Sequence, residues 1–187
     1  MQNAVSKGEG GMVAILGSTV DKIESILERN KNENTIEIAN DNSEGQIVLS
    51  GKNDDLNKFV EVLKINNIKN IKLPVSAPFH CRLMNKATEV MKIELEKVNF
   101  QNSNIKLISN VTAKEIANKD ELKKLLIKQV ENRVRWRESV INMIDKGINQ
   151  FIEIGPGKVL SGLIKRINKN VKINTINNEI DIKDLNI

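Results

Sequence analysis

The order of apolar and amphipathic segments in residues 10–75 constrains the fold more than any other feature of the chain. Four runs are apolar or alternating, as strands are: 11–17, 34–40, 45–51 and 68–76. Two amphipathic segments, 18–30 and 52–67, have the spacing of helices and separate the first strand from the second and the third from the fourth. The order is therefore β-α-β-β-α-β, which predicts a ferredoxin-like lobe.

Each predicted helix of this lobe has one apolar face and identifiable end signals. Ser18 and Asp21 have the spacing of a capping box at the start of the first helix. The turn-forming residues 41–45 separate the second strand from the third. The side chains expected to face the sheet are Val20, Ile23 and Leu27 of the first helix and Leu56, Phe59, Val60 and Leu63 of the second.

The rest of the chain has a different pattern, in which helices alternate with fewer strands. Helices are predicted at 84–98, 120–130, 136–147 and 158–167, and strands at 104–111, 150–154 and 171–176. Met84, Ala87, Met91, Leu95 and Val98 are expected to form the buried face of the first of these helices. Such alternation predicts a parallel sheet, but about three strands are too few for one covered on both faces. We therefore expect an incomplete α/β lobe here.

Composition excludes several classes of function. The net charge is +5, but the lysines are scattered and no aromatic platform accompanies them, so nucleic-acid binding is not indicated. One cysteine excludes an internal disulfide and a cysteine-rich zinc site. No apolar run approaches the roughly 20 residues that cross a bilayer, and residues 1–10 lack the apolar core of a signal peptide. The expected location is the cytoplasm, with no membrane partner.

His80 is the only histidine of the chain and the strongest candidate for chemistry. It follows a predicted strand, in a proline-containing loop at the junction of the two lobes, where clefts form. A histidine there can act as a base near neutral pH. The alternative is a histidine whose ring is satisfied by local hydrogen bonds. A metal role has less support, because no second histidine or paired cysteine offers ligand spacing.

Five segments, in order, resemble those of bacterial malonyl-CoA:acyl-carrier-protein transacylases. They are "GGMVAILG", "GQIVLSG", "LPVSAPFHCRLM", "KQVENRVRW" and "FIEIGPGKVLSGLIKRI". The resemblance covers nearly the whole chain and implies a ferredoxin-like lobe at 10–75 inserted in a large α/β-hydrolase-like lobe, of which 1–9 and 76–187 would be the C-terminal part. It also implies malonyl transfer from coenzyme A to the phosphopantetheine arm of acyl carrier protein for fatty acid synthesis, without a cofactor.

The resemblance assigns roles to three residues. His80 would accept the proton of a nucleophilic serine, and the backbone carbonyl of Gln129 would orient its ring. Phe79 would accompany a preference for malonyl groups, although packing in the cleft is an alternative for it. Without the resemblance, Gln129 would be assigned as a solvated helix residue. "GPG" at 155–157 could cradle a phosphate, but the resemblance implies a structural turn there.

The nucleophile that this family requires is missing from the sequence. The family's serine lies in a Gly-His-Ser-x-Gly elbow, and no Gly-x-Ser-x-Gly string occurs here. The string "DNSEG" has Asp41 in place of the first glycine, and Ser76 lies outside any elbow pattern. By resemblance, residues 1–5 align just past the family's malonate-binding arginine. We therefore expect that Met1 corresponds to an internal methionine and that the nucleophile of His80 is not on this chain.

Three interpretations follow from this pattern. The chain is the C-terminal part of a malonyl transacylase, inactive alone and active beside a separate N-terminal fragment that carries the serine. Alternatively, it is a non-catalytic module that binds acyl carrier protein or pantetheine. The third interpretation is a decaying remnant without a stable fold, because an incomplete parallel sheet exposes apolar surface that promotes aggregation.

Overall fold

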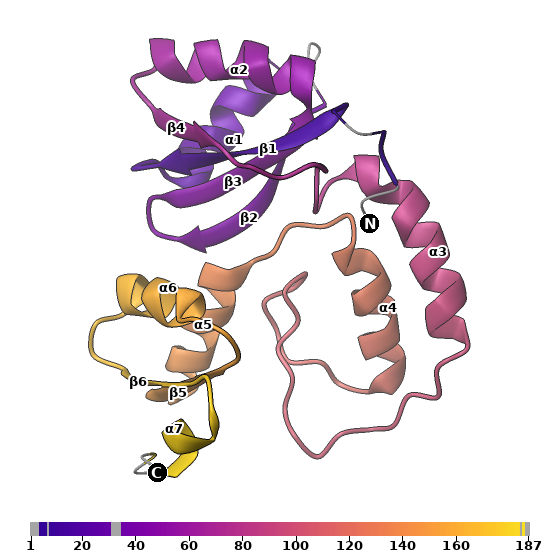
Figure 1. Ribbon diagram of the computed structural model, residues 1–187, viewed down its shortest axis with the longest axis vertical. Helices are drawn as coiled ribbons and strands as arrows, with labels where there is room; N and C mark the ends of the chain where they lie inside the picture. The colour runs from indigo at the N-terminus through magenta and orange to yellow at the C-terminus, as the bar shows by residue number, and fades with distance from the viewer. Residues whose placement is uncertain (1–3, 7, 31–34, 184, 186–187) are drawn as a thin grey trace.

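The computed structural model describes residues 4–6, 8–30, 35–183 and 185 (Figure 1). The expectation for Met1 concerns a residue that lies outside the described ones. In Figure 1 the N-terminal half of the chain forms a sheet with two helices on one side, and the C-terminal half lies below it.

The N-terminal half is a four-stranded antiparallel sheet with the strand order β2-β3-β1-β4. Its elements are β1 (Gly10–Leu16), α1 (Val20–Arg29), β2 (Glu37–Ser43), β3 (Gln46–Lys52), α2 (Asn53–Ile65) and β4 (Lys69–Lys72). The predicted β-α-β-β-α-β order is therefore present, with the strand order of a split βαβ unit. We call residues 10–72 the sheet unit.

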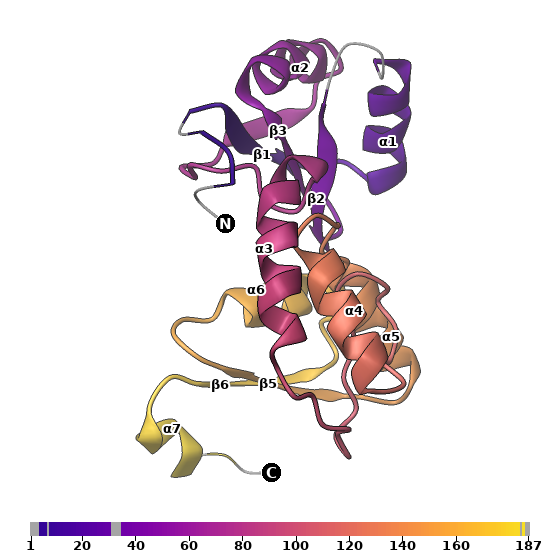
Figure 2. The same ribbon diagram turned by 90° about the vertical axis from the view of Figure 1, so that its right-hand side faces the viewer.

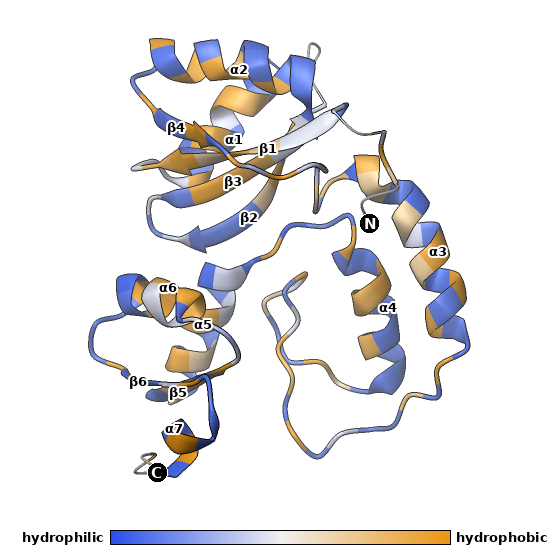
Figure 3. Cartoon of the chain, in the orientation of Figure 1, coloured by the Kyte–Doolittle hydropathy of each residue, from blue (hydrophilic) through white to orange (hydrophobic). Residues whose placement is uncertain are grey.

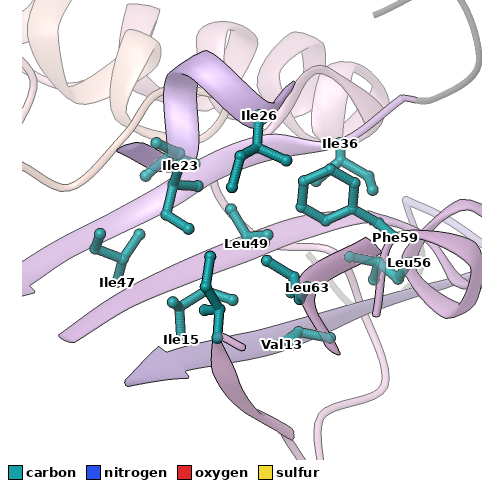
Figure 4. Close-up of a cluster of buried hydrophobic side chains, with 12 residues drawn as sticks. Val13, Ile15, Ile23, Ile26, Ile36, Ile47, Leu49, Leu56, Phe59 and Leu63 are labelled. Atoms are coloured by element: carbon teal, nitrogen blue, oxygen red, sulfur yellow. The ribbon is translucent and has the colours of Figure 1, made fainter. Parts of the chain in front are cut away.

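The core of the sheet unit lies between the sheet and its two helices (Figure 4). Val13 and Ile15 of β1 alternate with residues that face the other side of the sheet. The other buried members are Ile23, Ile26, Ile36, Ile38, Ile47, Leu49, Leu56, Phe59, Leu63 and Ile68. Each fully buried large aliphatic side chain contributes about 1.5–3 kcal/mol, so this cluster holds the sheet unit together.

Two local predictions for the sheet unit are wrong in detail. The N-cap of α1 is Thr19, whose hydroxyl accepts from the Lys22 amide at 3.3 Å, whereas the Ser18 hydroxyl is buried without a partner. The cap moves by one residue because the extended residue before the first helical turn is Thr19. In addition, β2 continues to Ser43, so the turn expected at 41–45 is confined to Glu44 and Gly45.

The C-terminal half contains a short 3-10 turn (Arg82–Met84), several helices and a two-stranded parallel sheet. The helices are α3 (Asn85–Glu96), α4 (Lys119–Gln129), α5 (Trp136–Asp145), α6 (Val159–Ile167) and α7 (Glu179–Lys183). The strands β5 (Gln150–Ile154) and β6 (Lys172–Ile176) pair in parallel, as predicted. Val140, Ile164 and Val171 form the buried cluster between α5, α6 and this sheet. None of the described helices is long and apolar enough to span a membrane.

One prediction for this half is wrong, and another holds only in part. Residues 104–111 form no strand, and only one bridge joins Ile108 to Glu115. No strand among the described residues lies beside this segment to complete its hydrogen bonds. The buried face expected on 84–98 is present only in part. Met84 is fully buried, and Ala87 and Leu95 are partly buried, whereas Met91 and Val98 are 37% and 50% exposed. The helix α3 lies against α4 (Figure 2) and has apolar residues along its length (Figure 3).

Candidate active site

His80 lies in the loop that leaves β4 and leads to α3, and its backbone has an unusual conformation. Its φ is +59°, in the left-handed region that residues with a β-carbon rarely adopt. Such a conformation persists only where the surrounding structure holds it, and it is frequent at functional sites. His80 as a residue is half-buried.

The loop is held on both sides of His80 by buried neighbours. Pro78 is fully buried against β1, where a β-carbon on Gly10 would lie 2.4 Å from the Cγ of Pro78. The thiol of Cys81 donates to the Pro78 carbonyl at 3.1 Å and accepts from the Ser50 hydroxyl of β3 at 3.6 Å. The sheet unit therefore fixes the backbone that carries the strained His80.

The ring of His80 contacts the backbone of Gln129 at the C-terminal end of α4. Nδ1 of His80 is 3.0 Å from the carbonyl oxygen of Gln129. A carbonyl oxygen can only accept, so Nδ1 carries the proton of this bond and Nε2 of the neutral ring is an acceptor. No other hydrogen bond of the ring occurs within the described part of the chain, which leaves Nε2 available to a reacting group.

Two residues near His80 in the sequence, Cys81 and Ser76, could in principle be nucleophiles, but neither has a suitable environment. Burial raises the pKa of the Cys81 thiol, and a raised pKa disfavours the reactive thiolate. The Cys81 side chain is also completely buried. Ser76 lies on an exposed part of the loop and belongs to no strand-to-helix turn. The arrangement thus orients the His80 ring, and neither Cys81 nor Ser76 has the setting of a nucleophile.

Phe79 is partly buried and packs on the face of the sheet opposite the helices. Its neighbours there are Met12, Ala39, Val48 and the partly buried Leu73. These contacts account for its position by packing alone, and the role of Phe79 in malonyl preference stays a prediction.

A cavity of about 540 Å³ lies between α1, β2 and the segment that follows α4, and neither His80 nor Gln129 lines it. Arg82 and Glu131, each two residues beyond a member of the pair, are among its lining residues. The three arginines that line the cavity each pair with a glutamate. Nε of Arg82 lies 2.6 Å from Glu37, Nη2 of Arg133 lies 2.6 Å from Glu24, and Nη1 of Arg135 lies 2.9 Å from Glu138. The positive charges of the cavity wall are therefore matched by negative charges, and the cavity is not a cationic site.

The "GPG" turn at 155–157 precedes a helix whose N-terminus is already occupied by a carboxylate. Glu153 of β5 accepts from the amides of Leu160 at 3.0 Å and Ser161 at 2.7 Å. Burial would raise the pKa of Glu153, but the donors of Ser161 and the Leu160 amide outweigh it, so the pKa lies below its usual value. The donors that a phosphate would need at this end of α6 are used by the protein itself.

Replacing this carboxylate should reduce stability in a pH-dependent way. A lowered pKa in the folded state stabilises the fold above the ordinary glutamate pKa, and this contribution is lost as the pH falls through the folded value. We expect Glu153→Gln to lower the free energy of unfolding by about 1 kcal/mol at pH 7 and by less near pH 3. Urea unfolding at both pH values measures this difference. An equal loss at both would show that the charge is unimportant.

Several residues that support the site could not be recognised from the sequence alone. Gly10 and Ser50 act through contacts with a loop distant in the sequence, and Asp41 of β2 binds Arg137 of α5 in a buried ion pair. Their residue types are common in strands and turns, and no local spacing marks them. Among the described residues, no group of three or more histidine, cysteine, aspartate or glutamate side chains could hold a metal ion.

Comparison with known proteins agrees with the resemblance. The family of the acyl transferase domain matches residues 1–180. The malonyl CoA-acyl carrier protein transacylase of Bacillus subtilis (strain 168) is 41% identical over 174 residues, which are 92% of this chain and 55% of that protein. That of Staphylococcus aureus (strain MRSA252) is 37% identical over 188 residues, with 100% of this chain and 61% of that protein covered.

A solved structure gives the same result in three dimensions. The crystal structure of the malonyl CoA-acyl carrier protein transacylase from Clostridium perfringens ATCC 13124 matches with a TM-score of 0.94 at 41% identity, over 98% of this chain and 58% of that chain. The chain thus spans 55–61% of the length of the two curated relatives and 58% of this solved one.

Proposed function

Because the chain belongs to the acyl transferase domain family, among the malonyl CoA-acyl carrier protein transacylases, we propose that it contributes the base to malonyl transfer from coenzyme A to acyl carrier protein. His80 would take the proton of a serine that attacks the malonyl thioester. It would give this proton to the departing sulfur of coenzyme A. It would then take the proton of the pantetheine thiol that attacks the malonyl ester, and return it to the serine oxygen as the ester bond breaks. The serine would come from polypeptide outside these 187 residues.

The observation that carries this proposal is the bond between His80 Nδ1 and the Gln129 carbonyl. It fixes the tautomer in which Nε2 accepts a proton, which is the state that a general base needs. A carbonyl does this without adding a second charge beside the ring. The strained backbone of His80, a half-buried residue, supports the same role.

The uncovered face of the C-terminal sheet supports the expectation that further polypeptide completes the large lobe. Phe151 and Ile173 pack against α5 and α6, whereas Ile152 and Ile154 of β5 point to the other face and are 38% and 78% exposed. Parallel sheets are normally covered on both faces. Val90 and Ile93 of α3 add further exposed apolar surface.

A fusion tests the proposal directly. The segment of the Bacillus subtilis relative that this chain does not match is fused ahead of Met1, and malonyl transfer from malonyl-CoA to holo acyl carrier protein is measured. We expect the fusion to be active and the 187-residue chain alone to be at least about 10³-fold slower, since the chain has no Gly-x-Ser-x-Gly nucleophile. Mass spectrometry should find the malonyl ester on the added segment.

Two outcomes would contradict the proposal. One is a malonyl ester on a serine of the 187-residue chain itself. The other is a fusion that folds, as judged by circular dichroism and thermal unfolding, but transfers no malonyl group. If the chain alone bound acyl carrier protein while a folded fusion stayed inactive, the non-catalytic binding module would be favoured.

A further inference from the structure

We propose that Asp41 and Arg137 are positioning residues for His80, acting through the backbone carbonyl of Gln129. Any effect of this pair on malonyl transfer rests on the proposed function. Its effect on the orientation of the His80 ring can be measured without substrate. Failure of the positioning proposal is therefore distinguishable from failure of the proposed function.

The pair joins the sheet unit to the start of α5. Nε of Arg137 donates to both oxygens of Asp41 at 3.0 Å, and Nη2 of Arg137 lies 2.9 Å from Oδ2. The side chain of Asp41 is 1% exposed and that of Arg137 is 27% exposed. A bidentate contact of this kind fixes direction as well as distance, so it sets the orientation of α5 relative to β2.

The segment just before α5 is paired to the same strand. The Val134 amide donates to the Ala39 carbonyl at 2.8 Å, and the Asp41 amide donates to the Val134 carbonyl at 2.9 Å. Residue 134 thus extends the edge of the sheet at β2, next to the ion pair. Asp41 holds this segment twice, through its backbone to Val134 and through its side chain to Arg137.

A closed turn connects this paired segment to the carbonyl that contacts His80. The Asn132 amide donates to the Lys128 carbonyl at 3.1 Å, and Nε2 of Gln129 donates to the Asn132 carbonyl at 3.0 Å. Val130 within the turn is buried. Because the turn is closed at both ends, a shift of Val134 along β2 would carry the Gln129 carbonyl with it.

The sheet unit therefore holds both partners of the histidine contact. Gly10 and Ser50 position the loop with His80, while Asp41 positions the chain that leads back to Gln129. Catalytic groups require placement within fractions of an ångström, so a common support for both partners has a clear use. A common support of this kind would hold the ring of His80 in one orientation.

The test uses the ring of the single histidine, whose nitrogen resonances are free of overlap in the 187-residue chain. At about pH 8.5 the wild-type ring should be mainly the Nδ1–H tautomer, because Nδ1 donates to the Gln129 carbonyl. We expect the double variant Asp41→Leu/Arg137→Met to lower the ratio of the Nδ1–H to the Nε2–H tautomer by about two- to fivefold, the change for weakening or loss of one neutral hydrogen bond.

Two further variants separate positioning from a general loss of structure. Arg137→Lys retains the charge beside Asp41 but loses the bidentate contact, so its ratio should lie between those of wild type and the double variant. Glu61→Gln removes the exposed ion pair to Lys64 on α2 and should leave the ratio unchanged. A folded double variant with the wild-type ratio would overturn the proposal. If the double variant does not fold, Asp41→Asn replaces it under the same criteria.

Discussion

Replacing His80 with glutamine in the fusion enzyme is expected to lower kcat/KM for malonyl transfer by at least about 10³-fold. Glutamine has similar length and can still donate to the Gln129 carbonyl, but it cannot accept a proton from serine or thiol. The loss should appear in kcat, because the ring acts on the reacting atoms rather than on substrate affinity. Steady-state transfer to holo acyl carrier protein measures both parameters.

The matched control is Gln129→Ala, which should cost less than about tenfold. His80 contacts the backbone carbonyl of residue 129, and this group is retained in alanine. The side chain of Gln129 donates instead to the Asn132 carbonyl at 3.0 Å, so its loss loosens only the following turn. Equal losses for the two variants would contradict the assignment of the base. So would a His80→Gln enzyme with near wild-type kcat.

The β-α-β-β-α-β order could be predicted because its segments are strongly periodic and pair mainly with near neighbours. Ile23 of α1 and Leu56 of α2 recur on one helical face, and both are buried in the core. The strand expected at 104–111 was wrong because a strand depends on a partner, and its apolar pattern alone does not supply one. The exposed face of α3 has the same explanation.

The site could be predicted only in part, for a related reason. His80 and Gln129 were expected from the resemblance, and the structure brings their ring nitrogen and carbonyl to 3.0 Å. Their catalytic roles remain predictions. Gly10, Asp41 and Arg137 support this contact from other elements, through a close approach and a buried ion pair. These effects depend on tertiary packing, which no local spacing of residues encodes.

Arg137→Met is expected to be the most destabilising substitution in the contact between the two halves, with a loss of about 3–5 kcal/mol near neutral pH. It leaves the carboxylate of Asp41 buried and without its charged partner. Asp41→Leu should cost less, because Arg137 retains some exposure and can contact water. The double variant Asp41→Leu/Arg137→Met should recover most of the loss, since apolar side chains fill the same space without desolvated charges. Urea unfolding of the four proteins measures the cycle.

The pH dependence of this cycle distinguishes a desolvated charge from a simple packing defect. Burial raises the pKa of Asp41, and the hydrogen bond from Arg137 opposes the shift without cancelling it. A raised pKa in the folded state stabilises the fold below the ordinary value of 3.8, and this contribution is lost as the pH rises through the folded value. Without Arg137 the shift should be larger, so the penalty of Arg137→Met should shrink as the pH is lowered towards 4. A penalty that is constant with pH would mean that the substitution acts through lost packing, and the charge of Asp41 would then have no part in holding α5 against β2.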